Sequence, residues 1–214
     1  MSDPDQAPPA FDDPAGTWNR RFSQPGYLFG TEPNAWLHEH GELWEAGQRV
    51  LCVADGEGRN SVWLAQRGLT VDAFDISEVG VRKARDFARI TGVKVNFAVA
   101  DIAQLQWPQG LYDGVIAIFI QFADPQLRSR IFRGMVQALK PGGILLLQGY
   151  TPMQLEYRTG GPPIASHMYT PEMLRDAFAG MEILKLREYE CELAEGTGHK
   201  GRSAVVGMVA RKPA

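Results

Sequence analysis

Residues 51–60, "LCVADGEGRN", run from an apolar stretch into a turn that holds two glycines, two acids and an arginine. Leu51 to Ala54 have the composition of a buried strand. Because glycine has no Cβ, Gly56 and Gly58 would let the backbone come close to a bound molecule. Open α/β sheets bind ligands at the carboxyl ends of their strands. The stretch therefore predicts the first strand of such a sheet, followed by a turn shaped to hold a ligand.

Strand-like and helix-like runs alternate after this turn. Helices are expected to be capped by Ser77 and Asp124. Strands that alternate with helices form a parallel sheet with helices on both faces. The predicted strands are 49–54, 69–75, 93–100, 112–120 and 144–150, and the predicted helices are 60–68, 77–92 and 124–143.

The end of the chain breaks this alternation. A short helix opened by "TPEML" (170–174) is followed by two strand-like runs, 181–193 and 201–211, with no helical pattern between them. They are expected to pair antiparallel. The predicted fold is thus α/β: a doubly wound, mostly parallel seven-stranded sheet with an antiparallel C-terminal hairpin. It resembles the Rossmann-like fold of class I S-adenosylmethionine-dependent methyltransferases, whereas a nicotinamide-binding Rossmann domain continues with helices.

Three regions are expected along the chain. Residues 1–16 hold four prolines and four aspartates, which predicts a flexible tail. Residues 17–47 are predicted to form an ordered cover, with a helix that Asn34 caps and that runs to Trp44. Residues 48–214 hold the sheet. The cover has five aromatic side chains, namely Trp18, Phe22, Tyr27, Phe29 and Trp36. Of these, Trp18, Phe22 and Tyr27 could pack as core or shield a ligand.

Composition and charge argue against several kinds of partner. The net charge is −3 and the 22 lysines and arginines are scattered, which disfavours nucleic-acid and anionic-membrane binding. No stretch is apolar enough to span a membrane, and the N-terminus lacks signal-peptide character. Cys52 and Cys191 give neither a disulfide framework nor a metal-binding spacing. We expect a cytoplasmic protein with a small-molecule partner and no metal, and the oligomeric state stays open.

Two aspartates at predicted strand ends narrow the kind of ligand. Asp75 ends the second strand, where a carboxylate can accept both hydroxyls of a ribose, and Asp101 ends the third. A dinucleotide would need a third glycine where Ser61 stands, and Asp55 and Glu57 would repel its phosphates. The turn therefore suits an uncharged or cationic ligand. S-adenosylmethionine fits, since it carries a sulfonium and no phosphate.

A family resemblance rests on segments spread over most of the chain. They are "WNRRF" (18–22), "YLFGTEPNAWL" (27–37), "VLCVADGEGRNSVWLA" (50–65), "LKPGGILLLQGY" (139–150), "RTGGPP" (158–163) and "EGTGHKGRSAVVGMVARK" (195–212). Together they resemble the bacterial class I methyltransferases related to tellurite-resistance and thiopurine methyltransferases. The resemblance implies methyl transfer from S-adenosylmethionine to a small molecule, makes residues 48–214 the methyltransferase domain, and carries over no particular acceptor.

The resemblance also implies roles for single residues. It puts the glycine turn against the methionine part of the cofactor, the end of the second strand at the ribose and adenine, and the end of the third at the adenine amine. Arg21 matches an arginine of the leading aromatic motif and is expected to pair with the cofactor's carboxylate. The expected cofactor-binding residues are Trp18, Arg21, Tyr27, Gly30, Asp55, Gly56, Gly58, Asn60, Asp75, Ile76, Asp101, Ile102 and Ile118.

Two positions depart from the family pattern. Cys52 stands where many relatives have an acid that braces the loop, and Gln121 stands where many have histidine. A thiol or metalloid oxyanion would need no base, because holding the nucleophile in line and excluding water suffices. An oxygen or amine acceptor would need help. The polar candidates are Arg59, Gln121, Tyr150 and His199, although the glycine-rich surroundings of His199 predict a surface position.

Other functions remain as alternatives. Without an evident base, the chain could be a sensor or accessory protein that binds S-adenosylmethionine and transfers nothing. A nicotinamide-dependent oxidoreductase is disfavoured by Ser61, Glu57 and the terminal hairpin. Asp75 and Asp101 could also be no more than local caps of a helix or turn.

Overall fold

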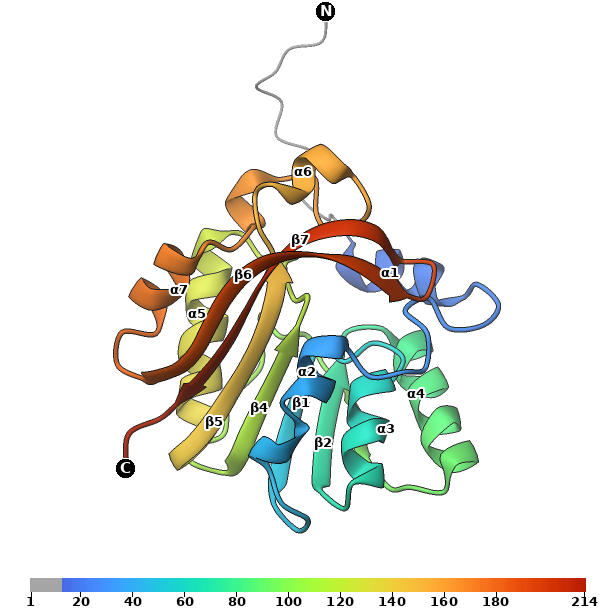
Figure 1. The fold of residues 1–214 in the computed structure, drawn as a ribbon. Coiled ribbons are helices and arrows are strands. Elements are labelled where there is room, and N and C mark those ends of the chain that lie inside the picture. The colour runs from blue at the N-terminus through green and yellow to red at the C-terminus, as the bar shows by residue number, and fades with distance from the viewer. Residues whose placement is uncertain (1–12) are drawn as a thin grey trace, which may run out of the picture.

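In residues 13–214, which the computed structural model describes, seven strands form one sheet in the order β3-β2-β1-β4-β5-β7-β6 (Figure 1). The strands are β1 (Arg49–Val53), β2 (Thr70–Asp75), β3 (Asn96–Val99), β4 (Tyr112–Ile118), β5 (Leu139–Tyr150), β6 (Glu182–Glu195) and β7 (His199–Arg211). The α-helices are α1 (Pro14–Phe22), α2 (Ala35–Glu39), α3 (Arg59–Gln66), α4 (Glu78–Thr91), α5 (Pro125–Ala138), α6 (Gln154–Tyr157) and α7 (Pro171–Ala177). Two 3-10 turns span Gly41–Leu43 and Ala165–His167.

The strand pairing confirms the predicted fold. β1 pairs in parallel with β2 and with β4, and the pairs β2–β3 and β4–β5 are also parallel. β7 pairs antiparallel with both β5 and β6. The chain therefore winds away from β1 in two directions and ends in an antiparallel hairpin. The strand order reverses between β1 and β4, and open α/β sheets bind ligands at such a switch point.

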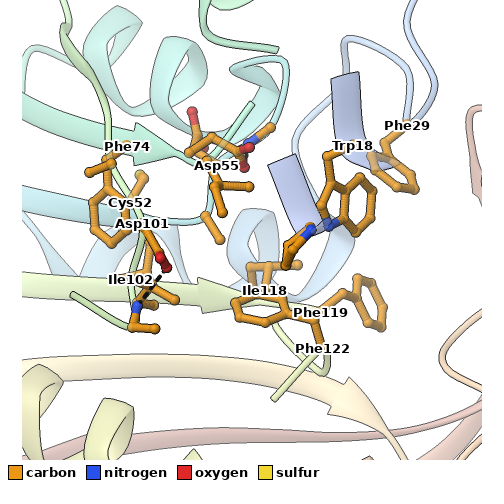
Figure 2. A pocket seen from close by; sticks show the side chains of 18 of the residues that line it. Trp18, Phe29, Cys52, Asp55, Phe74, Asp101, Ile102, Ile118, Phe119 and Phe122 are labelled. Carbon is orange, nitrogen blue, oxygen red and sulfur yellow. Dashed lines mark hydrogen bonds between the residues drawn. The ribbon is translucent and has the colours of Figure 1, made fainter. Parts of the chain in front are cut away.

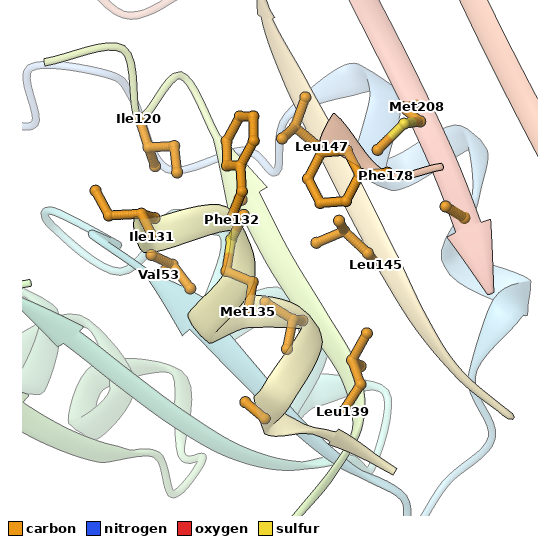
Figure 3. Close-up of a cluster of buried hydrophobic side chains, with 14 of the residues drawn as sticks. Val53, Ile120, Ile131, Phe132, Met135, Leu139, Leu145, Leu147, Phe178 and Met208 are labelled. Carbon is orange, nitrogen blue, oxygen red and sulfur yellow. The ribbon is translucent and has the colours of Figure 1, made fainter. Parts of the chain in front are cut away.

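Each face of the sheet carries its own apolar core. Along β1, Leu51 and Val53 join the cluster that packs against α5 and α7, whereas Val50 and Cys52 join the cluster beneath α2 and α3. This alternation follows from the two-residue period of a strand. Figure 3 shows the first cluster, in which Met135 of α5 packs over the sheet. Burying such a side chain contributes about 1.5–3 kcal/mol, so the two clusters hold the helices on the sheet.

The predicted helix caps are present. Ser77 Oγ accepts a hydrogen bond from Gly80 N at 3.0 Å, and Asp124 Oδ1 accepts one from Leu127 N at 2.8 Å. α4 ends at Gly92, whose φ of 73° is the left-handed conformation that glycine favours. These local signals fix where α4 and α5 begin.

Two helix boundaries differ from the sequence expectation. The helix capped by Asn34 ends at Glu39 rather than at Trp44, because His40 leaves the helical conformation with φ −112° and ψ 17°. A 3-10 turn follows it. α5 ends at Ala138, because the next residue is already extended and pairs with β4.

The N-terminal cover begins earlier than expected. α1 starts at Pro14, and Asp13 Oδ1 accepts a hydrogen bond from Gly16 N at 2.8 Å as its cap. Residues 14–16 were expected in the tail and instead belong to this helix, with Asp13 as its cap; residues 1–12 lie outside the described residues. No helix within residues 13–214 is both long and apolar enough to cross a lipid bilayer.

Candidate functional site

A pocket of about 630 Å³ opens at the carboxyl ends of β1, β2, β3 and β4, beneath α1 (Figure 2). Its volume is typical of a small-molecule site. In Figure 2, Asp101 lies toward one end of the pocket, Trp18, Phe29 and Phe119 lie toward the other, and Asp55 lies between them. The predicted site residues on its wall are Trp18, Asp55, Gly56, Arg59, Asn60, Asp75, Ile76, Asp101, Ile102, Ile118 and His199.

Asp75 organises the glycine turn after β1. Its Oδ2 accepts a hydrogen bond from Gly56 N at 2.9 Å, and its Oδ1 accepts one from Ser77 N at 2.8 Å. The resemblance implied that this turn lacks a brace, because Cys52 stands where many relatives have an acid. The carboxylate of Asp75 braces the turn. Each oxygen keeps a second lone pair for a ligand hydroxyl. Burial raises the pKa of Asp75, although the backbone donors oppose this.

Asp55 is the best-matched group for a cationic part of a ligand. It lines the pocket, and its Oδ2 accepts a hydrogen bond from Ser61 Oγ at 2.5 Å. Among residues 13–214, no group hydrogen bonds to its buried Oδ1. Burial raises the pKa of Asp55 to about 7, partly offset by Ser61. A ligand ammonium would satisfy both the open oxygen and the charge, which is what the amino group of S-adenosylmethionine offers.

Asp101 closes the far end of the pocket. Its Oδ1 accepts a hydrogen bond from Ala103 N at 2.8 Å, and its Oδ2 accepts one from Gln104 Nε2 at 3.0 Å. The carboxylate therefore caps the turn after β3, which was the alternative role that the sequence left open for Asp101. It also lines the pocket. The side chains of Ile76 and Ile102 lie beside it on the wall, which gives this end an apolar surface suited to a flat base.

The N-terminal cover is tied to the glycine turn by Glu57. Glu57 Oε2 accepts a hydrogen bond from Leu28 N at 2.7 Å, and its other oxygen pairs with Lys83 of α4. The side chain is 4% exposed and points to the cover rather than into the pocket. On the pocket side of the cover, Trp18 stacks on Phe22 with ring centroids 5.3 Å apart.

The sequence segments "YLFGTEPNAWL" (27–37) and "EGTGHKG" (195–201) meet in space. Leu28 O accepts hydrogen bonds from Thr197 N and Gly198 N, both at 2.9 Å. A Cβ on Gly198 would lie 2.5 Å from Phe29 Cε1, so a glycine is needed for this close approach. The tip of the β6–β7 hairpin therefore rests on the cover, and both close over one end of the pocket.

A buried ion pair joins the same parts of the chain. Arg59 NH2 lies 2.7 Å from Glu195 Oε2, and Asn34 Nδ2 donates to Glu195 Oε1 at 2.9 Å. Asn34 N also donates to Asn60 Oδ1 at 2.9 Å. Arg59 and Asn60 thus lock the start of α3 to the cover and hairpin. Burial would raise the pKa of Glu195, but bonding by His199 and the charge of Arg59 hold it at about 2.

The expected surface position of His199 is wrong. The residue is 7% exposed and lines the pocket. Its ring packs 4.3 Å from the ring centroid of Phe29 and 4.4 Å from that of Phe119. The hairpin folds over the sheet edge, so the first residue of β7 turns inward. Glycine content alone could not show this.

Gln121 and Tyr150 do not line the pocket. Gln121 Oε1 accepts a hydrogen bond from Tyr150 N at 2.5 Å, and its Nε2 donates to Tyr150 O at 2.9 Å and to His167 O at 3.2 Å. Its amide is therefore committed to the backbone. Tyr150 is 1% exposed and stacks on Phe119 at 4.5 Å. Both are corrected from candidate acceptor-side residues to structural ones.

Four expected cofactor residues also lie off the pocket wall. Tyr27 packs on Phe87 of α4 at 5.4 Å, and the guanidinium of Arg21 lies 4.4 Å over the ring of Trp18. Gly30 lies against the hairpin tip at Gly196. Gly58 caps α3, and a Cβ on it would lie 2.8 Å from that of Ala84. These residues shape the cover and the turn rather than the wall.

Sequence reasoning missed one side of the pocket. The residues on this side come from the loop after β4, the start of α5 and the turn before α7. None of these segments carries a recognisable sequence motif. The end of β4 could have been found from topology, since parallel strands end at one edge. The missed lining residues include Phe119, Phe122, Leu127, Ile164, Ser166 and His167.

The comparisons with known proteins agree with this geometry. Residues 50–143 match a family model described as a methyltransferase domain. The chain is 34% identical over 105 residues to the methyltransferase GfsG of Streptomyces halstedii, covering 48% of this chain and 37% of GfsG. It is 28% identical over 163 residues to a ubiquinone biosynthesis O-methyltransferase of Rickettsia canadensis, covering 68% and 67%. The chain thus spans about a third of the first relative and two thirds of the second.

Solved structures show the same fold. The N-methyltransferase NodS from Bradyrhizobium japonicum in complex with S-adenosyl-L-homocysteine superposes with a TM-score of 0.69 at 14% identity, covering 94% of this chain and 98% of that one. TehB from Haemophilus influenzae gives 0.68 at 20% identity, covering 84% and 62%. The particular resemblance to tellurite-resistance and thiopurine methyltransferases stays a prediction. The chain therefore has the fold of these methyltransferase structures, and its residues 50–143 match a methyltransferase domain.

Proposed function

We propose that the chain transfers a methyl group from S-adenosylmethionine to a small-molecule acceptor. The observation that carries the proposal is the covered pocket at the β1–β4 switch point, with a braced Asp75 and an open Asp55 oxygen on its wall. The relatives named for ubiquinone biosynthesis support a small acceptor. The expected cytoplasmic location and the three-region division of the chain stay predictions.

The pocket supports a division of labour along its length. Asp55 would hold the ammonium of the cofactor, Asp75 the ribose hydroxyls, and Asp101 with Ile102 the adenine. When bound, S-adenosylmethionine supplies a methyl group made electrophilic by its sulfonium. The chain's own part is to hold the acceptor in line with that methyl group and to exclude water, which the cover and hairpin do by closing the pocket.

The nature of the acceptor's nucleophile decides what else the chain must do. A thiol, a metalloid oxyanion or another soft nucleophile, which the sequence allows as the acceptor, needs no base in this pocket. A hydroxyl or amine must lose a proton as its bond to carbon forms. Asp124, Leu127 and Ile164 lie on the remaining wall together with Phe119 and Phe122, so this wall is mainly apolar.

Calorimetry tests the proposal. S-adenosylmethionine and S-adenosylhomocysteine should both bind, whereas NAD should not. Turnover across phenols, amines, thiols and metalloid oxyanions then separates an enzyme from a sensor that binds cofactor alone. Tight binding of NAD without binding of the methyl donor would overturn the proposal, and donor binding without any turnover would favour the sensor.

A further inference from the structure

His199 is held in place on every side. Its ring lies between the rings of Phe29 and Phe119, at 4.3 Å and 4.4 Å, and edge-on to Tyr150 at 5.8 Å. The residue is 7% exposed and lines the methyl-transfer pocket. Packing of this kind fixes the plane of the imidazole and leaves it little freedom to rotate.

One ring nitrogen of His199 faces a carboxylate. Nδ1 lies 3.5 Å from Glu195 Oε2, and it has no closer polar partner among residues 13–214. No hydrogen bond forms at this separation, so Nδ1 is an unsatisfied buried atom beside the carboxylate, and catalytic contacts often tighten to hydrogen bonds only when a substrate binds. Nε2, on the other side of the ring, is left to meet a molecule in the pocket.

The carboxylate itself is fixed by three other groups. Glu195 Oε2 pairs with Arg59 at 2.7 Å, and Oε1 accepts from Asn34 Nδ2 at 2.9 Å and from Ala35 N at 3.3 Å. Glu195 is therefore ionised and cannot turn away from the histidine. A carboxylate at Nδ1 favours the tautomer that carries its proton there, which leaves a lone pair on Nε2.

Burial keeps the ring of His199 neutral at physiological pH. Burial lowers its pKa, and the positive charges of Arg59 and Arg21 act in the same direction. Glu195 acts in the opposite direction. Tyr150, the remaining titratable group packed against the ring, is uncharged because burial raises the pKa of its hydroxyl. A neutral imidazole with an open Nε2 can take a proton from a ligand.

The pocket wall near His199 indicates what that ligand is. Phe119, Phe122, Leu127 and Ile164 give this wall apolar surface beside the polar Asp124, Ser166 and His167, and Phe29 closes it from the cover. Flat rings pack well against such side chains. Among residues 13–214, the basic side chain that lines the pocket is Arg59, and Glu195 already pairs with it. An uncharged aromatic acceptor therefore fits better than an oxyanion.

We propose that His199 is the general base for methylation of an aromatic hydroxyl group, with Glu195 and Arg59 as its positioning residues. The inference rests on the proposed methyl-transfer function. As the acceptor oxygen bonds to the methyl carbon, the carbon–sulfur bond breaks with its electron pair, and the hydroxyl proton passes to His199 Nε2. The positive charge that leaves the sulfur thus reappears on the imidazolium, where Glu195 stabilises it.

The first test needs no turnover. In protein labelled with ¹⁵N-histidine, the ring shifts of His199, assigned by their loss in His199→Gln, report which nitrogen carries the proton. We expect a neutral ring at pH 7 with the proton on Nδ1. A proton on Nε2, or a protonated ring, would overturn the proposal because the nitrogen left for the pocket could not accept.

The second test uses a matched pair of probes, 2-naphthol and 2-naphthalenethiol, with S-adenosylmethionine. A phenolic hydroxyl ionises less readily than a thiol, as the pKa values of about 10 for tyrosine and about 8.5 for cysteine show, and an aromatic thiol is more acidic than cysteine. His199→Gln should lower kcat/KM for the naphthol by about 10²–10⁴-fold, the usual contribution of general base catalysis. The thiol should lose much less. His38→Gln, an exposed histidine on α2, should leave both rates unchanged.

Each contrary outcome has a distinct meaning. Equal losses for both probes would show that His199 only packs. A loss for the naphthol in His167→Gln, with none in His199→Gln, would give the base to the other histidine on the wall. Methylation of the thiol alone, or of neither probe, by wild-type protein that binds S-adenosylhomocysteine would overturn the acceptor class. Failure to bind S-adenosylhomocysteine would instead overturn the proposed function, and the tautomer measurement would still judge His199.

Discussion

The carboxylate of Asp75 serves the fold and the ligand at once. It accepts hydrogen bonds from Gly56 N and Ser77 N while it lines the pocket. We predict that Asp75→Asn, which keeps the shape, weakens S-adenosylhomocysteine binding tenfold or more in calorimetry, because hydrogen bonds to a charged group are each worth about 1.5–3 kcal/mol. Asp101→Asn, at the far end of the pocket, is the matched comparison and should weaken S-adenosylhomocysteine binding less. Unchanged affinity in folded Asp75→Asn would reduce Asp75 to a local brace.

The raised pKa of Asp55 predicts pH-dependent cofactor binding. Burial raises this pKa to about 7, and pairing with an ammonium needs the ionised form. Affinity for S-adenosylhomocysteine should therefore fall as pH is lowered from 8 to 6. Binding near pH 7 should release a proton, which calorimetry in buffers of different ionisation enthalpy can measure. Asp55→Asn should bind weakly with a flatter pH dependence; the wild-type slope in that variant would assign the titration elsewhere.

The raised pKa of Asp55 also makes the stability of the fold depend on pH, in the opposite direction from cofactor affinity. The folded pKa lies above the unfolded value of about 3.9, so the folded state holds the proton more tightly. The stability that this residue contributes is complete below the unfolded pKa and is lost as pH rises through about 7. We predict that Asp55→Asn raises the melting temperature more at pH 8 than at pH 5. A gain that does not grow with pH would show that the buried charge is not the cause.

At the scale of elements, the start of α3 depends on a glycine for packing. Gly58 has φ of 91°, and a Cβ there would lie 2.8 Å from the Cβ of Ala84 in α4. We predict that Gly58→Ala lowers the free energy of unfolding by more than the roughly 1–2 kcal/mol of a left-handed residue alone. Gly92→Ala is the matched control, because its φ is 73° and nothing lies within 4 Å of its Cβ. Equal losses in urea unfolding would mean that the contact with Ala84 relaxes freely.

The elements themselves were largely predictable, and their contacts were not. The alternation of strands and helices, with caps at Ser77 and Asp124, follows from local patterns that the chain keeps in the fold. The contact of Leu28 with Thr197 joins residues 169 apart, and no local pattern encodes it. The same non-local contact brings His199 inward. Site residues on strand ends could therefore be predicted, whereas those placed by the hairpin and by the turn before α7 could not.

At the scale of the whole molecule, the cover belongs to both the fold and the site. Asn19 Oδ1 accepts hydrogen bonds from Ser77 Oγ at 2.6 Å and from Val79 N at 3.2 Å, so α1 adds a second cap to α4. Phe22 is 2% exposed, and its ring lies close to Gly56 and Gly80. Loss of the cover would therefore expose apolar surface and free the glycine turn as well as open the pocket.

Truncation separates these roles. Removing residues 1–12 should change neither stability nor S-adenosylhomocysteine affinity, because α1 and its cap at Asp13 remain. Removing residues 1–33 should leave a folded sheet, since β1 to β7 all follow, but should lower the melting temperature and abolish cofactor binding. In the full chain, adding S-adenosylmethionine should protect residues 14–33 from protease, as expected of a cover that closes over the cofactor. A shortened chain that keeps normal cofactor affinity would show that the aromatic side chains of α1 only pack against α4, and Trp18 would leave the site.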